Sequence, residues 1–378
     1  AQTVEGSMKA AGDMLQRIRE LAVQSANASN SASDRQALQQ EVNQLVSELD
    51  RVAQTTEFNG QKLLDGSFGT QQFQVGANAN HTIVAATANL RTSVYGNNQV
   101  SGTAAGGATA QATIATATAY ASNGVVAGTI AINGALGKAD IAVASNAHAK
   151  DIAQAVNQQT QSTGVSATAR PEAQIKFGSA GSYAITIESE NKTDPKTISF
   201  SLTAKDSAEG LSAAVQAINE QSSKTGVVAS LNKDSTAIVL TNATGNTMAI
   251  GVTAAANAGT VDVTKMTGNG KGGVSTMGTT QSMATNAGAV AVAVSGYITL
   301  DSDKSFSAVS TTTTALSGTA ATLNSDLKKV SELDITDFSK ATHSLKTVDS
   351  ALSYIAGERA KLGALQSRFE TSIAALQV

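Results

Sequence analysis

Few residues in this chain combine the types and the spacing that chemistry requires. Gly268–Gly273 fits the G-x-G-x-x-G pattern of a phosphate-binding loop, and Val261–Val263 before it could form a strand. That fingerprint also needs a helix that begins at the last glycine and an acidic residue roughly 20 positions further on. Neither follows Gly273. We therefore interpret the segment as a loop.

A second candidate, Asp301–Ser305, resembles the start of a calcium-binding loop. Such a loop requires glycine at its sixth position and glutamate at its twelfth. Phe306 and Thr312 occupy those positions here. The segment therefore predicts a polar turn and no metal site.

The remaining titratable residues form no catalytic constellation. His81, His148 and His343 are far apart and share no metal-ligand spacing, so we expect them at the surface. Acidic pairs such as Glu188 and Glu190 lack the positional context that acid–base catalysis would need. We predict a protein that is not an enzyme and that uses no cofactor or metal.

The densest group of apolar and charged residues lies on one predicted helix, between Leu15 and Gln24. At 100° per residue, Leu15, Ile18 and Ala22 share an apolar seam. The other side of the helix carries Arg17, Glu20, Leu21 and Gln24. Leu21 is unusual among charged neighbours. It either packs against a second helix or contacts a partner molecule.

Long helices at both ends of the chain position this group. The first is predicted over residues 4–26. The second begins after Ser33, which has capping-box spacing to Gln36, and ends at the turn signal Asn59-Gly60. A helical pattern resumes between Thr319 and Asp337 and leads into a last helix at about 338–376. Its apolar residues recur at a spacing of seven, which is typical of helices that pair. They are Val348, Ile355, Leu362, Phe369 and Leu376.

The segment between the helices is predicted to be rich in β-structure. Phe73 and Val75 alternate, Gly76–Asn78 turns the chain and Thr82–Val84 returns. Further short β-runs follow at 125–132, 183–187, 197–202 and 237–240. The segment also contains an internal repeat. Ala-Val-Asn at 155–157 is followed by Thr-Gly-Val at 163–165, and Ala-Ile-Asn at 217–219 is followed by Thr-Gly-Val at 225–227. The offset between the copies is constant at 62, for example from position 164 to position 226. Each copy predicts a short helix, a turn and a strand.

Composition narrows the class of protein. Aromatic residues are 3% of the chain, Trp and Cys are absent, and the net charge is −3. A core of Ala, Val, Leu and Ile is therefore expected, and no basic surface for nucleic acid is indicated. No run of 18 apolar residues predicts a membrane span, and no secretory signal is visible near the start. Because the first residue is Ala1, we expect a fragment of a longer protein.

Several segments together resemble one family. Leu15–Asn27 is similar to the signature segment of the bacterial flagellins. Phe58–Leu64 and Phe73–Gly76 resemble further blocks of that family, and Val348–Leu352 and Leu362–Phe369 resemble its C-terminal helix. The 62-residue repeat is similar to a small motif in the variable regions of many flagellins.

The resemblance implies an α+β fold. Both chain ends, residues 1–98 and 318–378, would form a long antiparallel helical rod, the inner domain. Residues 99–317 would form an inserted β-rich outer region, in which the 62-residue repeat forms either two similar subdomains or the two halves of one. Family members carry further amphipathic segments at both ends, which drive polymerisation. A fragment without them is expected to be soluble, monomeric and unable to polymerise.

The resemblance also implies a function. The chain would be a structural subunit of the flagellar filament, exported through the flagellar secretion channel and extracellular. Its partners would be other flagellin subunits, an export chaperone, the filament cap and the flagellin-sensing toll-like receptor of animals. The expected receptor and subunit contacts are Leu15, Gln16, Arg17, Leu21, Gln24 and Glu41.

An alternative from another class is a cell-surface protein whose outer region captures a polysaccharide or a host ligand. Sugar rings stack on aromatic side chains, and the few candidates are Tyr183, Tyr297 and Phe306. A hydrolase in the outer region is a more distant alternative, because the sequence identifies no acid and base pair for it.

Overall fold

The computed structural model describes residues 1–27, 29–77, 81–103, 111–113, 118–192, 194–269, 276–317 and 320–378. The chain forms two compact units. The helical unit consists of Ala1–Asn97 and Leu327–Val378, and the β unit consists of Asn98–Asp326. The boundaries fall within two strands, β5 (Gly96–Ser101) and β22 (Asp326–Lys329).

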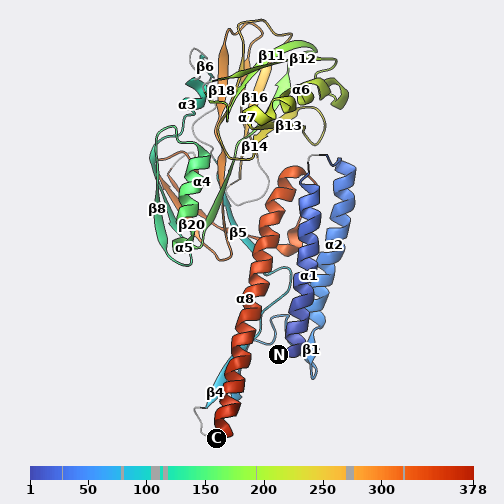
Figure 1. The fold of residues 1–378 in the computed structure, drawn as a ribbon, viewed down its shortest axis with the longest axis vertical. Helices are drawn as coiled ribbons and strands as arrows, with labels where there is room; N and C mark the ends of the chain where they lie inside the picture. Colours follow the sequence, from blue (N-terminus) through green and yellow to red (C-terminus); the bar gives the residue numbers. More distant parts are fainter. Residues whose placement is uncertain are drawn as a thin grey trace. The chain divides into compact units, whose positions relative to one another are not determined.

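Three helices make up most of the helical unit. They are α1 (Gln2–Ser25), α2 (Ala32–Thr55) and α8 (Phe338–Leu376), and α1 packs against both of the others (Figure 1). The predicted seams are buried in one apolar cluster that includes Leu15, Leu49 and Val348. Burial on α8 ends early, because Ile355 is buried whereas Leu362 and Phe369 are half-buried and Leu376 is exposed.

The start of α2 differs from the prediction. The capping box is formed by Ser31 and Asp34, not by Ser33 and Gln36. Ser31 has an extended backbone, its Oγ accepts a hydrogen bond from the Asp34 N–H at 3.1 Å, and the Asp34 carboxylate accepts one from the Ser31 N–H at 2.9 Å. A carboxylate accepts more strongly than an amide oxygen, so it holds the helix start two residues earlier.

The last helix begins at Phe338, as predicted. Its N-cap is Asp337, whose carboxylate accepts a hydrogen bond from the Lys340 N–H at 2.7 Å. Within the interval between Thr319 and Asp337, in which a return to helical structure is predicted, the described residues first form strands. β21 (Ala321–Asn324), β22 and a short 3₁₀ turn, η1 (Val330–Glu332), precede the helix.

Two hairpins follow α2, as the turn signals predict. The strands β1 (Glu57–Phe58) and β2 (Gln61–Lys62) join through Asn59 and Gly60, whose φ angles are 52° and 79°. Positive φ at both central residues is the requirement of the two-residue hairpin turn. The strands β3 (Thr70–Gln74) and β4 (Thr82–Ala86) form the second hairpin, and Asn78 of its predicted turn lies outside the described residues.

The described strands of the β unit form four sheets, two of which share one apolar core. The first has the order β13-β14-β10-β16-β17, at Val227–Leu231, Ile238–Asn242, Glu172–Phe177, Val261–Thr267 and Thr276–Met283. The second has the order β12-β11-β15-β18-β6, at Lys196–Leu202, Gly181–Glu188, Met248–Val252, Val290–Val294 and Gln111–Thr113. The short helix α3 (Thr118–Ala121) packs against β6 and β18.

The other two sheets enclose a second apolar cluster, around Ile130, Val156 and Leu300. One has the order β22-β5-β19-β9, in which β19 spans Tyr297–Ser302 and β9 spans Ser166–Arg170. The other has the order β21-β20-β7-β8, with β20 at Ser307–Thr311, β7 at Gly128–Asn133 and β8 at Lys138–Val143. Of the β-run predicted at 125–132, only the residues from Gly128 onward form a strand, which is β7.

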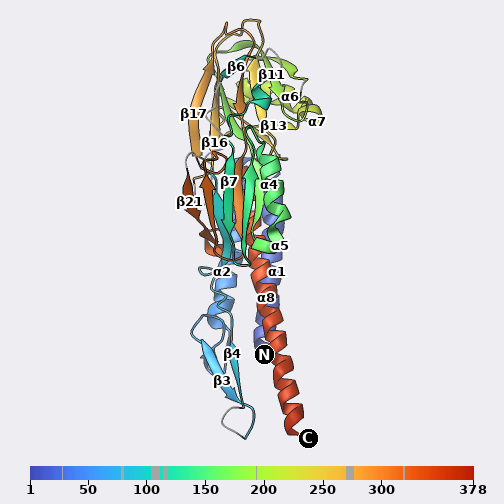
Figure 2. The ribbon, with the colours of Figure 1, turned by 90° about the vertical axis from the view of Figure 1, so that its left-hand side faces the viewer.

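Four helices of the β unit come in two matching pairs. The first pair is α4 (Ala149–Gln158) and α5 (Thr160–Thr163), which pack against β8, and α4 also packs against β9. The second is α6 (Ala208–Glu220) and α7 (Ser222–Thr225), and α6 packs against β12 and β13. Figure 2 shows α6 and α7 at one margin of their sheets and β17 at the opposite margin.

The predicted repeat is confirmed in hydrogen-bonding detail. The Asn157 side chain exchanges two hydrogen bonds with the backbone of Ala167, at 2.9 and 2.7 Å, and Asn219 does the same with Ala229 at the same two distances. Each pair of helices ends at a left-handed glycine, with φ of 78° at Gly164 and 74° at Gly226. Each copy is therefore one helix–turn–strand unit.

Candidate subunit-contact surface

The six predicted contact residues lie on α1 and α2 of the helical unit, but not all of them reach solvent. Gln16, Arg17 and Gln24 are exposed and Glu41 is half-buried. Leu15 is buried, as its place in the seam predicts. Leu21 is only 1% exposed, so it does not stand free among the charged residues.

The burial of Leu21 follows from the position of α1 between two helices. A helix that packs on one neighbour buries a single stripe, whereas α1 contacts both α2 and α8 and therefore buries a wider arc. Leu21 joins the same apolar cluster as Val42 and Leu49 of α2. Of the two interpretations that the sequence leaves open for Leu21, the burial supports packing against the second helix.

An ion pair joins the two helices at the surface. The Arg17 Nε and Nη2 atoms lie 3.0 and 2.8 Å from Glu41 Oε1, and Arg17 Nη1 lies 3.1 Å from Glu20 Oε2. The hydrogen bond to Glu41 raises the pKa of Arg17 further above its ordinary value. Exposed pairs of this kind add little stability. Their main effect here is to hold the guanidinium group in one orientation across the α1–α2 boundary.

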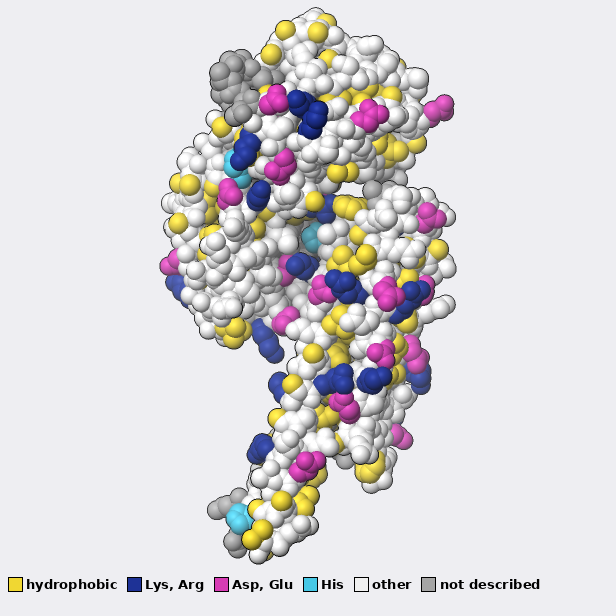
Figure 3. Space-filling view, in the orientation of Figure 1, with side chains coloured by type: hydrophobic (Ala, Val, Ile, Leu, Met, Phe, Trp, Pro, Cys, Tyr) yellow, Lys and Arg dark blue, Asp and Glu magenta, His cyan; other side chains and the backbone are white. Residues whose placement is uncertain are grey.

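Two further ion pairs join α1 to α8. Arg19 Nε donates to Asp349 Oδ1 at 2.8 Å, and Arg359 Nε donates to Glu5 Oε1 at 2.9 Å. Figure 3 shows dark blue and magenta side chains interspersed along the helices on the face in view. That face presents mixed charge and no large patch of one sign.

Sequence reasoning missed one residue of this unit. Phe58 is 60% exposed at the tip of the β1–β2 hairpin. The signal was present in the sequence, because a phenylalanine directly before Asn-Gly sits beside a two-residue turn, where little can cover it.

The sequence contains candidates for metal-binding and phosphate-binding sites, and the described part of the chain supports neither. No group of three or more His, Asp or Glu residues there could hold a metal ion. Asp301 and Ser302 end strand β19 and are buried, so the predicted polar turn begins only after them. Gly270–Gly273 of the glycine-rich motif lies outside the described residues.

The three histidines do not all lie at the surface. His81 is exposed, whereas His148 and His343 are half-buried. The His148 ring stacks on Tyr120 with centroids 4.5 Å apart, and its Nδ1 lies 2.7 Å from Thr247 Oγ1. Burial lowers the pKa of His148 below its ordinary value.

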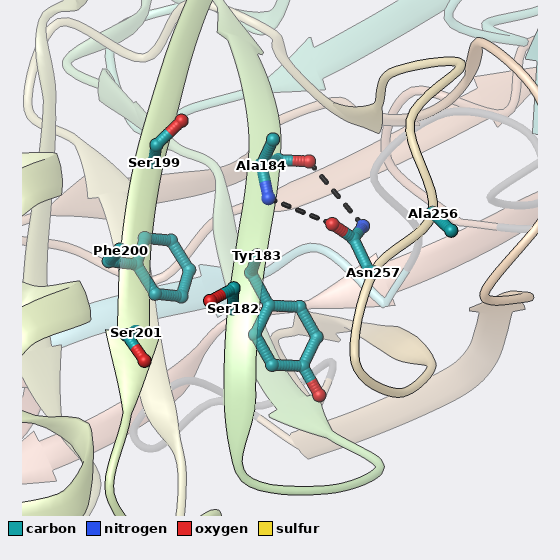
Figure 4. Close-up of a pocket in the computed structure, with 8 residues that line it drawn as sticks. All are labelled: Ser182, Tyr183, Ala184, Ser199, Phe200, Ser201, Ala256 and Asn257. Carbon is teal, nitrogen blue, oxygen red and sulfur yellow. Dashed lines mark hydrogen bonds between the residues drawn. The ribbon is translucent and has the colours of Figure 1, made fainter.

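The β unit has a shallow hollow of about 470 Å³ on β11 and β12 (Figure 4). Ser182, Ser199 and Ser201 line it. Asn257 also lines it, but its amide is already bonded to the Ala184 backbone, with the Ala184 N–H donating at 2.8 Å. The hollow therefore offers hydroxyl groups but little fixed recognition geometry.

The aromatic residues proposed as sugar-stacking platforms are buried. Tyr183 and Phe306 are 3% and 6% exposed, and Tyr297 is 1% exposed. Tyr183 packs in the core against Phe177 and Phe200. So little exposed area leaves these rings poorly placed to stack on a carbohydrate, which counts against the alternative of a polysaccharide-binding outer region. Among the described residues, no helix is long and apolar enough to cross a membrane.

Comparison with known proteins identifies two family segments. The family described as "Bacterial flagellin N-terminal helical region" matches residues 1–69. The family described as "Flagellin hook IN motif" matches residues 129–181 and 184–244, which contain the two copies of the repeat.

Individual relatives agree with these matches. The B-type flagellin of Pseudomonas aeruginosa is 35% identical over 374 residues, which are 99% of this chain and 73% of that flagellin. Flagellin B of Vibrio anguillarum is 50% identical over 91 residues, 24% of each chain. A solved structure of FliC from Burkholderia pseudomallei covers 97% of both chains with 20% identity and a TM-score of 0.37. The chain therefore belongs to the bacterial flagellins, the structural subunits that associate with one another into the flagellar filament outside the cell.

Proposed function

We propose that the α1–α2 surface of the exposed Gln16, Arg17 and Gln24 and the half-buried Glu41 contacts neighbouring subunits in the filament. The observation that carries this proposal is the fixed Arg17 guanidinium, held by Glu41 across two packed helices. A preorganised polar group loses little conformational entropy on binding and gives an interface its register. Leu15 and Leu21 act from beneath, because their burial fixes the helix that presents the polar row.

The same surface is proposed to bind the flagellin-sensing toll-like receptor when a subunit is detached from the filament. A surface that is occupied by neighbours in the polymer becomes free in the monomer. The support for this part is the match of the polar row to the family's contact residues. Receptor binding and subunit contact would then exclude one another.

Export through the flagellar secretion channel, with an export chaperone and the filament cap as partners, belongs to the same proposal. Membership of the flagellin family supports it. Co-purification of the chain with the chaperone from cells that assemble filaments would test it. Export that continues unchanged without any functional flagellar secretion channel would contradict it.

Arg17→Ala tests the contact surface, with Arg51→Ala as its matched control. Arg51 is also an exposed arginine paired with a nearby glutamate, Glu48, at 2.6 Å, but it lies outside the proposed surface. We expect Arg17→Ala to lower receptor affinity by about tenfold, a loss of ~1.4 kcal/mol, and to weaken filaments. Arg51→Ala should leave both unchanged.

Binding of purified monomers to immobilised receptor is the first measurement. The second is the melting temperature of filaments assembled from the variant chain with flagellin-type terminal segments added. Circular dichroism of each monomer shows whether the helices are intact. Equal effects of the two substitutions would contradict the assignment of the surface to Gln16, Arg17, Gln24 and Glu41.

A further inference from the structure

The tip of the β1–β2 hairpin has the sequence Asn59-Gly60, the dipeptide in which an asparagine amide is lost most readily. The Gly60 nitrogen can attack Asn59 Cγ because glycine has no side chain to obstruct the approach. The new N–C bond closes a five-membered succinimide, and the Asn59 amide leaves as ammonia. Water then opens the ring at one of its two carbonyls, which gives aspartate or isoaspartate. The reaction consumes only water and needs no enzyme.

Asn-Gly occurs four times in the chain, and the surroundings of these sites differ. Asn59 and Gly60 are exposed, and no hydrogen bond within the described part of the chain involves the Asn59 side chain or the Gly60 N–H. A Cβ added to Gly60 would meet nothing within 4 Å. The leaving amide and the attacking nitrogen therefore both face solvent. The site at 269–270 extends outside the described residues.

The Asn-Gly site at Asn123 and Gly124 is closed by its neighbours. The Asn123 side chain is 2% exposed, and its Nδ2 donates to Ala147 O at 3.0 Å and to Thr247 Oγ1 at 3.1 Å. The Gly124 N–H donates to Asn146 Oδ1 at 3.1 Å. Because the amide and the nitrogen are both held, the reaction at this site requires opening of the surrounding structure.

The Asn-Gly site at Asn133 and Gly134 is closed by strand pairing. Asn133 is the last residue of β7, and its Nδ2 donates to Ser307 Oγ on β20 at 3.2 Å. The Gly134 N–H donates to Gly137 O at 2.9 Å. The reaction here requires that β7 separates from its partner strands.

The β1–β2 hairpin, in contrast, can open while the rest of the helical unit stays folded. Each of its strands has two residues, and the two strands form a sheet of their own. The ion pair between Glu57 and Lys62, at 3.0 Å, joins two partly exposed side chains and adds little stability. An isolated two-stranded hairpin is only marginally stable in water. Local opening therefore lets the Gly60 nitrogen reach Asn59 Cγ.

We propose that Asn59-Gly60 converts spontaneously to isoaspartate in the folded chain, whereas the fold protects Asn123 and Asn133. Isoaspartate places its Cβ in the main chain and adds a carboxylate at the turn. The two-residue turn requires positive φ at two ordinary α-linked residues, so the pairing of β1 with β2 is lost. Aged subunits then differ from new ones at this hairpin. The inference does not depend on which surface contacts neighbouring subunits.

Incubation of the full chain at mildly alkaline pH tests the proposal. Mass spectrometry of digests follows the gain in mass when an amide becomes a carboxylate, and labelling by a purified isoaspartyl methyltransferase identifies isoaspartate. We expect Asn59 to react at least about a hundredfold faster than Asn123 and Asn133, because those sites need opening of the folded β unit. In urea the three sites should react at similar rates, since the dipeptide is the same.

A disulfide across the hairpin tests the role of local opening. The chain has no cysteine, and Glu57 pairs with Lys62 next to the Phe58–Gln61 pair that closes the turn. Such a non-hydrogen-bonded pair brings its Cα atoms close enough for a disulfide. In the double variant Glu57→Cys and Lys62→Cys, oxidation should slow the conversion of Asn59 by about tenfold, and reduction should restore it. Asn59→Gln, whose longer side chain closes the ring poorly, should abolish the mass gain in this peptide.

Three results would overturn the proposal. One is a folded chain in which Asn59 stays unmodified, or in which Asn123 or Asn133 converts as fast. Another is conversion of Asn59 at the same rate in the oxidised and the reduced double variant. The third is a difference between the sites that is as large in urea as in the folded chain, because the selectivity would then come from the neighbouring sequence.

Discussion

His148 is half-buried at the start of α4, where loss of contact with water penalises its charged form. Tyr120 covers one face of its ring and Thr247 meets its Nδ1. Desolvation lowers its pKa, with Lys192 and Lys150 acting in the same direction and Asp151 opposing them. The folded state therefore holds a proton on this ring less tightly than the unfolded chain does.

That difference predicts a loss of stability in acid. Stability from a lowered pKa is complete above the unfolded-state value and is lost as the pH falls toward the folded-state value. The melting temperature of the β unit should therefore drop between about pH 7.5 and about pH 5, a range that spans the ordinary histidine pKa of ~6.5. His148→Gln, which cannot become charged, should flatten this dependence. His81→Gln, at an exposed site, should not, and equal flattening by both would contradict the assignment.

Burial of single residues was the least predictable property. Leu21 lies among charged residues in sequence, yet it is buried in the apolar cluster to which α1, α2 and α8 all contribute. Tyr183 and Phe306 are named in the sequence as candidates for stacking on a sugar, yet both are buried. Whether a face is buried depends on a second layer of structure that local spacing does not encode.

At the scale of elements, the two asparagine bridges show how a helix end is joined to the next strand. Asn219 accepts from the Ala229 N–H and donates to its carbonyl, so the side chain supplies both hydrogen bonds that this buried residue needs. The same geometry at Asn157 and Ala167 explains why the repeat keeps asparagine in both copies.

Asn219→Ala should therefore destabilise the β unit. It leaves a buried N–H and a buried carbonyl without partners, at a cost of about 2 kcal/mol. Asn157→Ala should cost a similar amount. Gln216→Ala is the control on the same helix, since Gln216 bonds only to the exposed side chain of Glu220. Urea denaturation of the three variants measures the free energy of unfolding, and an equal cost for Gln216→Ala would refute the role of the bridges.

Helices and the repeat were predictable because their signals are local. The steps of three and four along α1 and the 62-residue offset both depend on short segments of sequence. The order of strands was not predictable. β10 lies between β14 and β16, and β19 lies between β5 and β9, and each arrangement joins segments that are far apart in the chain. Non-local pairing of this kind leaves little trace in local patterns.

At the scale of the whole molecule, the chain leaves the helical unit at Asn97 and returns to it at Leu327. The apolar cluster of the helical unit contains no residue of the β unit, and the apolar clusters of the β unit contain no residue of the helical unit. Separate cores support separate cooperative unfolding. Calorimetry of the whole chain should therefore show two thermal transitions.

Reciprocal cap substitutions assign those transitions. Asp337→Ala removes the N-cap of α8, where the carboxylate accepts from the Lys340 N–H, and Ser207→Ala removes the N-cap of α6, where the hydroxyl accepts from the Gly210 N–H. Each loss costs about 1 kcal/mol, which lowers a melting temperature by ~2–4 °C in units of this size. Asp337→Ala should shift only the transition of the helical unit and Ser207→Ala only that of the β unit. If either substitution moves both transitions together, the two cores unfold as one cooperative structure, and the filament subunit would have to be treated as a single folding unit.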